Sequence, residues 1–372
     1  MRKICLFFLL WTPLVALAAE PEPLDDSCRL KISSYLDVSY NYLVRSNHFY
    51  SGTHNREFDI NPNGFTLQQD AVTASIQPAN GFGGLINLIL GRDAFNTASY
   101  GINPNYIDNQ QLALDVYQLY VQYAQCRSTT MFGKMLSLAG YESTYSPGNL
   151  NFSHSLINFF DEPGTLIGVR EVFQMNDQIK LTAGVENAWD TVKYFSGPPA
   201  IELGITYTPN NKYSFTIDGY TGGQPFKDNI SYGPIGRRTL IDMFGTINIT
   251  DQLSFIANYD YLTQSRALFA NGNIGSAKSQ GVAAYLNYQF CKKWRTAFRA
   301  EIFSDAEGWR TGVAQCIKEV TLTLGFDPIK DLEFRLEARH DFANTKSIVN
   351  KNGINYSANQ QSYALDMVYN FP

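Results

Sequence analysis

The stretch VAAYLNYQFCKKWRTAFRAEI, residues 282–302, decides the fold that we expect for this chain. Apolar side chains occupy every second position on both sides of a short turn at residues 291–293, and the positions between them after the turn include Arg295, Arg299 and Glu301. Successive side chains of a strand point to opposite faces, so the pattern predicts a β-hairpin with one apolar and one charged face. A soluble sheet can share this pattern, so the number of copies and their connections must decide.

The hairpin pattern recurs along nearly the whole chain. We predict about 16 strands, the number and length typical of a transmembrane barrel, at residues 30–45, 64–78, 82–91, 112–125, 129–136, 165–175, 178–189, 200–208, 213–221, 239–249, 253–263, 282–290, 294–302, 317–326, 332–341 and 360–371. Short turns alternate strictly with long polar connections, the longest at residues 137–164. Short periplasmic turns, long outer loops and an even strand number predict an all-β, up-and-down transmembrane barrel.

Two of the predicted strands carry further signals. Between Leu67 and Val72 the alternation changes parity, which indicates a β-bulge. In residues 112–125 we expect the apolar face to point outward, with the side chains of Tyr117, Leu119, Val121 and Tyr123.

The N-terminus predicts export. Residues 1–18 combine Arg2 and Lys3, a short apolar run and a small-residue cleavage site, so they are expected to be a signal peptide. We expect residues 19–29 to be a periplasmic lead-in and residues 30–372 to form the barrel. After the signal no apolar run reaches the length of a membrane-spanning helix. Removing Arg2 and Lys3 takes the net charge from -5 to -7, which gives no support to nucleic-acid binding.

The cysteines predict no metal or redox centre. The mature chain keeps Cys28, Cys126, Cys291 and Cys316, and no pair has CxxC spacing. We expect one structural disulfide or none, and no cofactor. The first three lie on the periplasmic side of the predicted topology, so a pair among them is easier, and Cys316 at the outer end is expected to be unpaired.

A closed barrel explains both faces of the strands. Lipid cannot hydrogen-bond a sheet edge, so a membrane sheet must close with its apolar side outward. A soluble β-sandwich would hide that face in a core, and nothing in it would make every second connection short. The polar faces would then line a wet lumen with the charged residues Asp37, Arg170, Lys180, Glu186, Glu202, Asp218, Asp242, Asp260, Arg295, Arg299, Glu301, Glu319, Glu333, Arg335, Glu337, Arg339 and Asp366.

Some local motifs resemble one family of bacterial outer-membrane barrels, the OmpL-like putative β-barrel porins. The resemblance rests on Gly133-Lys134, Gly140-Tyr141-Glu142, Ser153-His154-Ser155, Thr165 with Gly168-Val169-Arg170, and Gly184 with Asn187-Ala188-Trp189-Asp190. It implies a role in the outer membrane and passive diffusion of solutes. The last strand resembles the aromatic-ended segment read by the barrel-insertion machinery, although Pro372 follows Phe371.

The main functional hypothesis is a water-filled diffusion pore for small polar solutes or ions. If residues 137–164 fold inward, Asp161 and Glu162 would form an acidic wall of a constriction. The opposite wall would be a basic ladder of Arg295, Arg299, Arg335 and Arg339. In the alternative interpretation, Glu301, Glu333 and Glu337 neutralise these arginines within the barrel wall.

Two other functions stay open at the level of sequence. An outer-membrane hydrolase would need a histidine base such as His154, between Ser153 and Ser155. A surface-binding or adhesion barrel would use Asn-rich loops such as residues 342–359. Outer-membrane lipid and the insertion machinery are the expected partners, and a homotrimer is an open alternative to a monomer.

Overall fold

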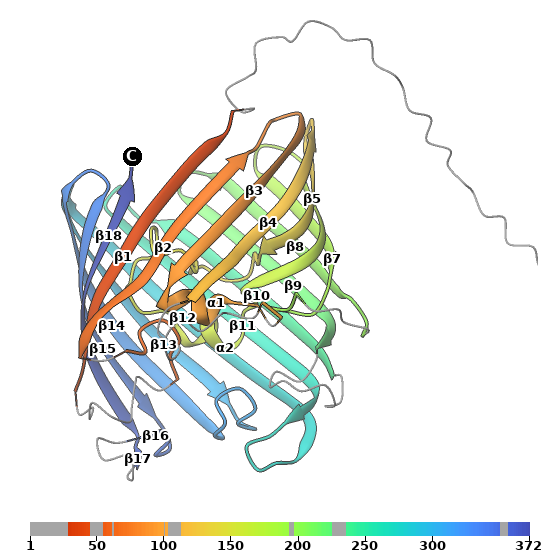
Figure 1. Ribbon diagram of the computed structural model, residues 1–372. Helices are drawn as coiled ribbons and strands as arrows, with labels where there is room; N and C mark the ends of the chain where they lie inside the picture. Colours follow the sequence, from red (N-terminus) through yellow and green to blue (C-terminus); the bar gives the residue numbers. More distant parts are fainter. Residues whose placement is uncertain are drawn as a thin grey trace, which may run out of the picture.

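A computed structural model describes residues 29–44, 55–61, 63–99, 101–102, 113–192, 197–224, 236–349 and 356–372, and sixteen of its strands form one closed barrel. The expected signal peptide and all but the last residue of the lead-in lie outside this part of the chain. The barrel closes where β1 (Lys31–Val44) pairs with β18 (Asn359–Phe371) on one side and β2 (Gly64–Ile76) on the other. All neighbouring strands are antiparallel, so the predicted up-and-down barrel is confirmed (Figure 1).

The remaining strands follow in chain order around the wall, with two short helices between them in sequence. They are β3 (Gly81–Gly91), α1 (Arg92–Thr97), β4 (Ala113–Gln125), β5 (Ser128–Leu136), α2 (Leu156–Phe160), β6 (Thr165–Gln174), β7 (Ile179–Glu186), β8 (Ala200–Asn210), β9 (Tyr213–Gln224), β10 (Gly236–Asn248), β11 (Leu253–Leu268), β12 (Ile274–Cys291), β13 (Trp294–Asp305), β14 (Gln315–Ile329) and β15 (Leu332–Ala343). A two-stranded sheet of β16 (Ile348–Val349) and β17 (Tyr356–Ser357) lies in the last long loop.

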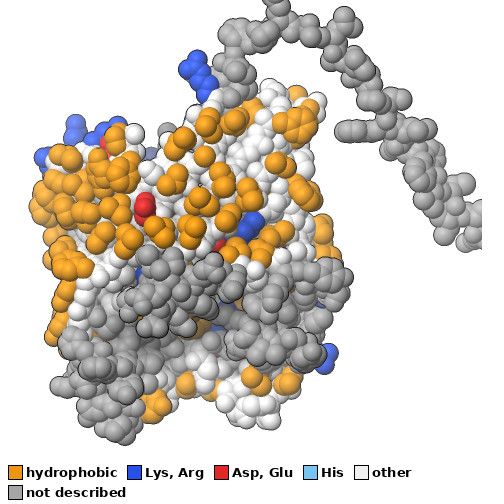
Figure 2. Space-filling model, viewed as in Figure 1, with side chains coloured by type: hydrophobic (Ala, Val, Ile, Leu, Met, Phe, Trp, Pro, Cys, Tyr) orange, Lys and Arg blue, Asp and Glu red, His pale blue; other side chains and the backbone are white. Residues whose placement is uncertain are grey.

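The outer face is apolar, as the alternation predicts. Phe82 and Phe65 expose 81% and 80% of their surfaces, whereas the inward-facing Arg299 exposes none. Figure 2 shows hydrophobic side chains spread over the outer face of the strands nearest the viewer, with few charges among them. A soluble protein would bury such side chains, so this distribution fits a lipid-facing wall.

Two bulges change which side chains face inward. Asp37 of β1 pairs with Gln69 of β2 and the next residue, Val38, pairs with Leu67, so Gln68 is an extra residue, as the parity shift predicts. In β4, Tyr117 is the extra residue opposite Asn87 and Leu88 of β3. The prediction that Tyr117 points outward is therefore wrong: the bulge turns its side chain into the barrel, where it is 1% exposed.

Two short helices, which alternation in the sequence did not predict, cover apolar patches inside the barrel. α1 adds Ala94 to a cluster with Ala71, Ile89, Ala113 and Tyr117 of the nearby strands. This explains why β3 is apolar on both of its faces: one meets lipid and the other meets α1. α2 packs Leu156, Ile157 and Phe160 against a second inner patch of β11 to β14. The lumen is thus partly filled by protein.

The β11–β12 hairpin extends farther than the predicted residues 253–263 and 282–290. Ala267 and Leu268 still pair with Gly275 and Ile274 at its far end. These outer residues are mostly polar, because they lie beyond the apolar band, so the alternation that marks a lipid-facing strand is missing there.

The short turns gather at the end of the barrel that carries the C-terminus (Figure 1). Aromatic pairs border this end, for example Trp294 stacked on Phe326 with ring centroids 4.3 Å apart. Such rings form the interfacial girdle of a membrane barrel. Among the described residues, no helix is sufficiently long and apolar to cross a membrane.

The described cysteines are unpaired thiols. Cys126 lies in a short turn and Cys291 is the last residue of β12; both are exposed, and Cys316 lies near the start of β14. The prediction that Cys316 is unpaired is confirmed, and Cys126 and Cys291 do not pair with each other. Cys28 lies outside the described residues.

Candidate functional site

The longest connection, residues 137–164, folds into the barrel and crosses its lumen; we call this segment the inner loop. It runs from the end of β5 to the start of β6 and contains α2. Its first part is held on the β9–β11 side, where Leu138 donates its N–H to the hydroxyl of Tyr220 at 3.0 Å and Tyr141 donates to Asn258 Oδ1 at 2.6 Å. The inward folding expected from the sequence is confirmed.

Arg299 of β13 is among the largest fully buried side chains of the described residues, and it joins the inner loop to the wall. Its guanidinium donates to Glu319 of the wall and to Glu142 of the loop, each at 2.6 Å. It also donates to the backbone oxygen of Ser153 at 2.6 Å and to that of His154 at 3.3 Å. All five donors of a guanidinium can be satisfied in such a ring, so Arg299 acts as an anchor of the loop.

The other three arginines of the ladder repeat this arrangement. Each binds one carboxylate of the wall and at least one carbonyl oxygen of the inner loop: Arg335 binds Asp366 at 2.5 Å and Ser146 at 3.2 Å, Arg339 binds Asp341 at 2.8 Å and His154 at 2.5 Å, and Arg295 binds Glu333 at 2.5 Å and Leu150 at 2.8 Å. The ladder is therefore neutralised and covered by the loop.

Wall glutamates bind the loop through its backbone N–H groups. Glu301 accepts from Leu156 and Ile157, at 2.7 and 2.8 Å, and so satisfies the free N–H groups at the start of α2. Glu337 accepts from Phe152 at 2.7 Å and Ser153 at 3.1 Å. Of the three glutamates expected to neutralise the arginines, only Glu333 forms an ion pair with one of them.

Asp161 and Glu162 do not face the arginine ladder. Asp161 accepts a hydrogen bond from Ser279 of β12 at 2.6 Å, and Glu162 lies beside Asp242 and Asp260. The expected pairing is wrong because α2 carries the end of the loop past the ladder and back toward β10 and β11. The loop acid that meets the ladder is Glu142, which the site prediction missed although it belongs to the motif Gly140-Tyr141-Glu142.

Among the other predicted lumen charges, Asp37, Glu319 and Asp366 lie near the ladder on β1, β14 and β18, and a second group lies on the β6–β11 side. Arg170 forms a bidentate ion pair with Glu202, with its Nε 2.6 Å from Oε2 and its Nη2 2.9 Å from Oε1. Asp242 lies directly opposite Asp218 of β9 and Asp260 of β11, so three aspartates form one row across neighbouring strands. All of these side chains are buried inside the barrel.

Burial changes the protonation of the loop acids in different directions. Burial raises the pKa of Glu142, but the opposing effects of Arg299 and then His154 outweigh this rise. The pKa of Glu142 is therefore below its usual value. Burial raises the pKa of Asp161 to about 7, although Arg310 and Ser279 oppose the shift. Burial and the neighbouring Asp242 raise the pKa of Glu162 well above its usual range. Near neutral pH, Glu142 is ionised and Asp161 titrates.

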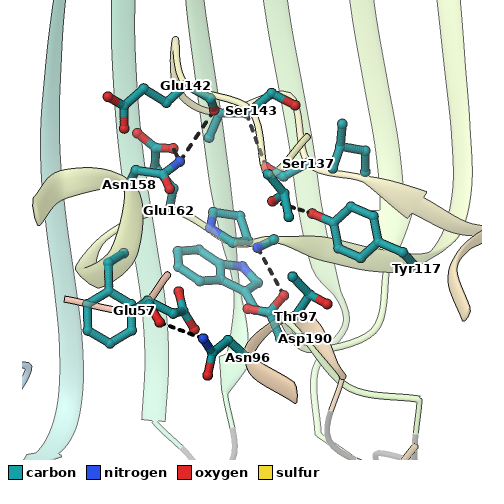
Figure 3. Close-up of a pocket in the computed structure, with 18 of the residues that line it drawn as sticks. Glu57, Asn96, Thr97, Tyr117, Ser137, Glu142, Ser143, Asn158, Glu162 and Asp190 are labelled. Carbon is teal, nitrogen blue, oxygen red and sulfur yellow. Dashed lines mark hydrogen bonds between the residues drawn. The ribbon is translucent and has the colours of Figure 1, made fainter. Parts of the chain in front are cut away.

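A cavity of about 410 Å³ lies between the inner loop and the outer strand ends. Figure 3 shows Glu162 and Asn158 on one side of it, Tyr117 and Ser137 on another, and Glu57 with Asn96 below. Its charged lining residues are Glu57, Glu142, Glu162, Asp190, Arg238 and Arg310. A second hollow of about 510 Å³ lies among the periplasmic turns and is bordered by Pro147 and Gly148 of the same loop. The inner loop therefore borders both hollows.

His154 is a packing residue in this structure. Its ring lies 4.1 Å from that of Phe58, and its Nε2 contacts the backbone oxygen of Ser143 at 2.9 Å. Burial lowers its pKa. The side chain of neighbouring Ser153 accepts from Arg299. Among the described residues no serine hydroxyl lies in hydrogen-bond contact with this ring, and His48 and His54 lie outside them.

The chain matches, over residues 29–371, the family described as Putative beta-barrel porin-2, OmpL-like. A search of the curated proteins found no match. Three solved structures with the same fold are similar over nearly their whole length. The outer membrane channel DcaP of Acinetobacter baumannii has 13% sequence identity and a TM-score of 0.62, covering 92% of this chain and 97% of that one. The anion-selective porin from Comamonas acidovorans has 9% identity and a TM-score of 0.63 (92% of this chain, 99% of that one), and in-vitro folded OmpT of Vibrio cholerae has 11% identity and a TM-score of 0.59 (94% and 99%). OmpT has also been solved in a trimer form.

Proposed function

The chain belongs to the family of OmpL-like barrels described as putative beta-barrel porin-2 and is an outer-membrane porin, and from this premise we propose that its pore passes small polar solutes and prefers cations over anions. Diffusion pores select ions through the charges that line their narrowest part. The charges of the lumen, rather than the fold, therefore carry this proposal.

The observation that supports a cation preference is the excess of acid inside the barrel. Eighteen carboxylates and seven lysine or arginine side chains are buried among the described residues. The arginines of the ladder are each bound to a carboxylate, so their field is largely cancelled. The carboxyl groups on the β9–β11 side have no basic partner in the described part of the chain, so the lumen there is acidic in character and favours cations over anions.

Asp161 makes the preference depend on pH. Its carboxyl has a pKa of about 7, so it is neutral below that pH and negative above it. Raising the pH through neutrality adds negative charge beside the lumen. The preference for cations should therefore increase with pH.

The test is the reversal potential of the purified porin in a planar bilayer under a KCl gradient. We expect the permeability ratio of K⁺ to Cl⁻ to exceed unity by about threefold or more and to rise from pH 6 to pH 8. In Asp161→Asn the rise should be clearly smaller, because one of the groups that gain charge in this range is removed. Asp251→Asn, in an exposed periplasmic turn, is the matched control and should behave like the wild type. A preference for Cl⁻ in the wild type would refute the proposal.

A homotrimer is part of the same proposal. It is supported by the fold shared with OmpT, whose structure includes a trimer form, and by the wide apolar outer surface in Figure 2. The hydrolase and adhesion hypotheses have no comparable support from the geometry described above.

A further inference from the structure

Three carboxylates from separate segments meet inside the barrel: Glu162 of the inner loop, Asp242 of β10 and Asp260 of β11. One oxygen of each lies within 4.8 Å of the others. Their side chains are 9%, 0% and 0% exposed. Oxygens on opposite sides of one Ca²⁺ ion are about 5 Å apart, since each ligand bond is about 2.4 Å long. The three groups therefore span the space of a single coordination shell.

No cationic side chain compensates these charges. None of the described lysines and arginines forms an ion pair with any of the three, whereas the four arginines of the ladder and Arg170 all have carboxylate partners elsewhere. Burying several ionised carboxylates without a counterion is strongly unfavourable. The cluster must share protons or hold a cation.

A second observation points to a ligand. Asp260 is fully buried, yet its Oδ2 has no hydrogen-bond partner among the described atoms. The same is true of Oδ2 of Asp218, which lies opposite Asp242 in the same row and is 2% exposed. Buried polar atoms almost always have a hydrogen-bond partner or a bound ion. A buried carboxylate oxygen without a partner, inside a cluster of acids, therefore points to a bound cation.

The surrounding donors orient the cluster without neutralising it. The amide of Asn258 donates to Asp242 Oδ1 at 2.7 Å and to Asp260 Oδ1 at 3.2 Å. Gly140 donates its N–H to Asp242 Oδ2 at 3.1 Å, and Asn158 donates to Glu162 Oε2 at 2.8 Å. Each carboxylate is thus held in place and still has free lone pairs.

We propose that Glu162, Asp242 and Asp260 bind one divalent cation, with Ca²⁺ preferred over Mg²⁺. Carboxylates from two rigid strands and one loop form an irregular oxygen cage, which suits the flexible coordination of Ca²⁺ better than the strict octahedron of Mg²⁺. Because Glu162 belongs to the inner loop, the cation ties the loop to the β10–β11 wall. The arginine ladder ties it to the opposite wall, so the loop is fixed on both sides.

The test measures binding directly and so does not depend on the ion selectivity proposed above. Calorimetric titration of metal-stripped, folded porin in detergent with CaCl₂ should give one Ca²⁺ per chain, with weaker binding of MgCl₂. Thermal unfolding should shift to higher temperature with Ca²⁺, because a ligand of the folded state stabilises it.

The variants locate the site. Glu162→Gln with Asp260→Asn should lower the Ca²⁺ affinity by at least about tenfold and abolish the thermal shift, since two charged ligands are lost. Asp251→Asn, a turn residue of the same hairpin, should bind like the wild type. The amides keep the size of the carboxylates, and heat-modifiable gel migration reports that the barrels are folded. No saturable Ca²⁺ binding in the wild type, or unchanged binding in the double variant, would overturn the proposal.

Discussion

At the scale of single residues, the inner loop depends on glycines that take a backbone shape other residues avoid. Gly140 and Gly148 both lie in this loop with positive φ angles, 88° and 99°. A Cβ at Gly140 would lie 1.9 Å from Glu162 Oε2, whereas one at Gly148 would meet nothing within 4 Å. The two positions therefore share backbone strain and differ in the space available.

This difference predicts the effect of alanine at each position. Both Gly140→Ala and Gly148→Ala should cost about 1 kcal/mol for the left-handed backbone. Gly140→Ala should cost about 1–2 kcal/mol more, because it must displace a buried, hydrogen-bonded carboxylate. Urea unfolding in detergent measures the two values. Equal losses would mean that Glu162 moves aside freely and is not held in its cluster.

At the scale of secondary-structure elements, the inner loop is an inserted element that the wall holds in addition to hydrogen bonds of its own, such as that from the Ser155 N–H to Glu142. Arg299 of β13 joins the loop to Glu319 of β14, and Arg295 and Glu301 of the same strand also bind the loop. α2 has only five residues, which is too short to be stable by itself. The loop should therefore loosen when its anchors are removed.

Replacing Arg299 tests this dependence. Arg299→Met should destabilise the barrel by about 3–5 kcal/mol, because it leaves Glu142 and Glu319 buried without their partner. Single-channel conductance should rise, because Arg295 and Glu301 alone hold the loop less tightly against β13. Arg299→Lys keeps the charge but loses the forked geometry of the guanidinium. Its stability and conductance should therefore lie between those of the wild type and Arg299→Met.

The control for this experiment is Arg127→Met, in an exposed periplasmic turn, which should change neither quantity. A stable Arg299→Met barrel with unchanged conductance would show that the remaining arginines hold the loop without it.

At the scale of the whole molecule, the barrel is reversed relative to a soluble protein: its charges are inside and its apolar side chains are outside. Adjacent residues of one strand show the contrast, since Ile205 on β8 exposes 41% of its surface to the outside and Thr206 faces inward. Strand alternation assigns the two to lipid and lumen.

This assignment predicts opposite tolerance for the same new charge. Ile205→Lys should destabilise the barrel in lipid vesicles by about 2–4 kcal/mol, while Thr206→Lys should cost less than about 1 kcal/mol. The readout is unfolding in vesicles of the two variants beside the wild type. If lysine were equally costly at both positions, Ile205 would not face hydrocarbon.

Sequence alone determined the barrel, its sixteen strands, the bulge near Gln68 and the inner position of the charged residues. These follow from side-chain alternation, which is a local property of each strand. It misplaced Tyr117, because a bulge shifts the parity without a clear signal where both faces are partly apolar.

Only the tertiary structure decided which charges meet. The inner loop has no periodic pattern, so nothing local says that Glu142 reaches Arg299, or that Asp161 and Glu162 turn away from the ladder. Glu162 joins Asp242 and Asp260 only because the loop crosses a lumen that closes when β1 pairs with β18. Contacts between segments far apart in sequence depend on the curvature and closure of the whole wall, and no single strand contains that information.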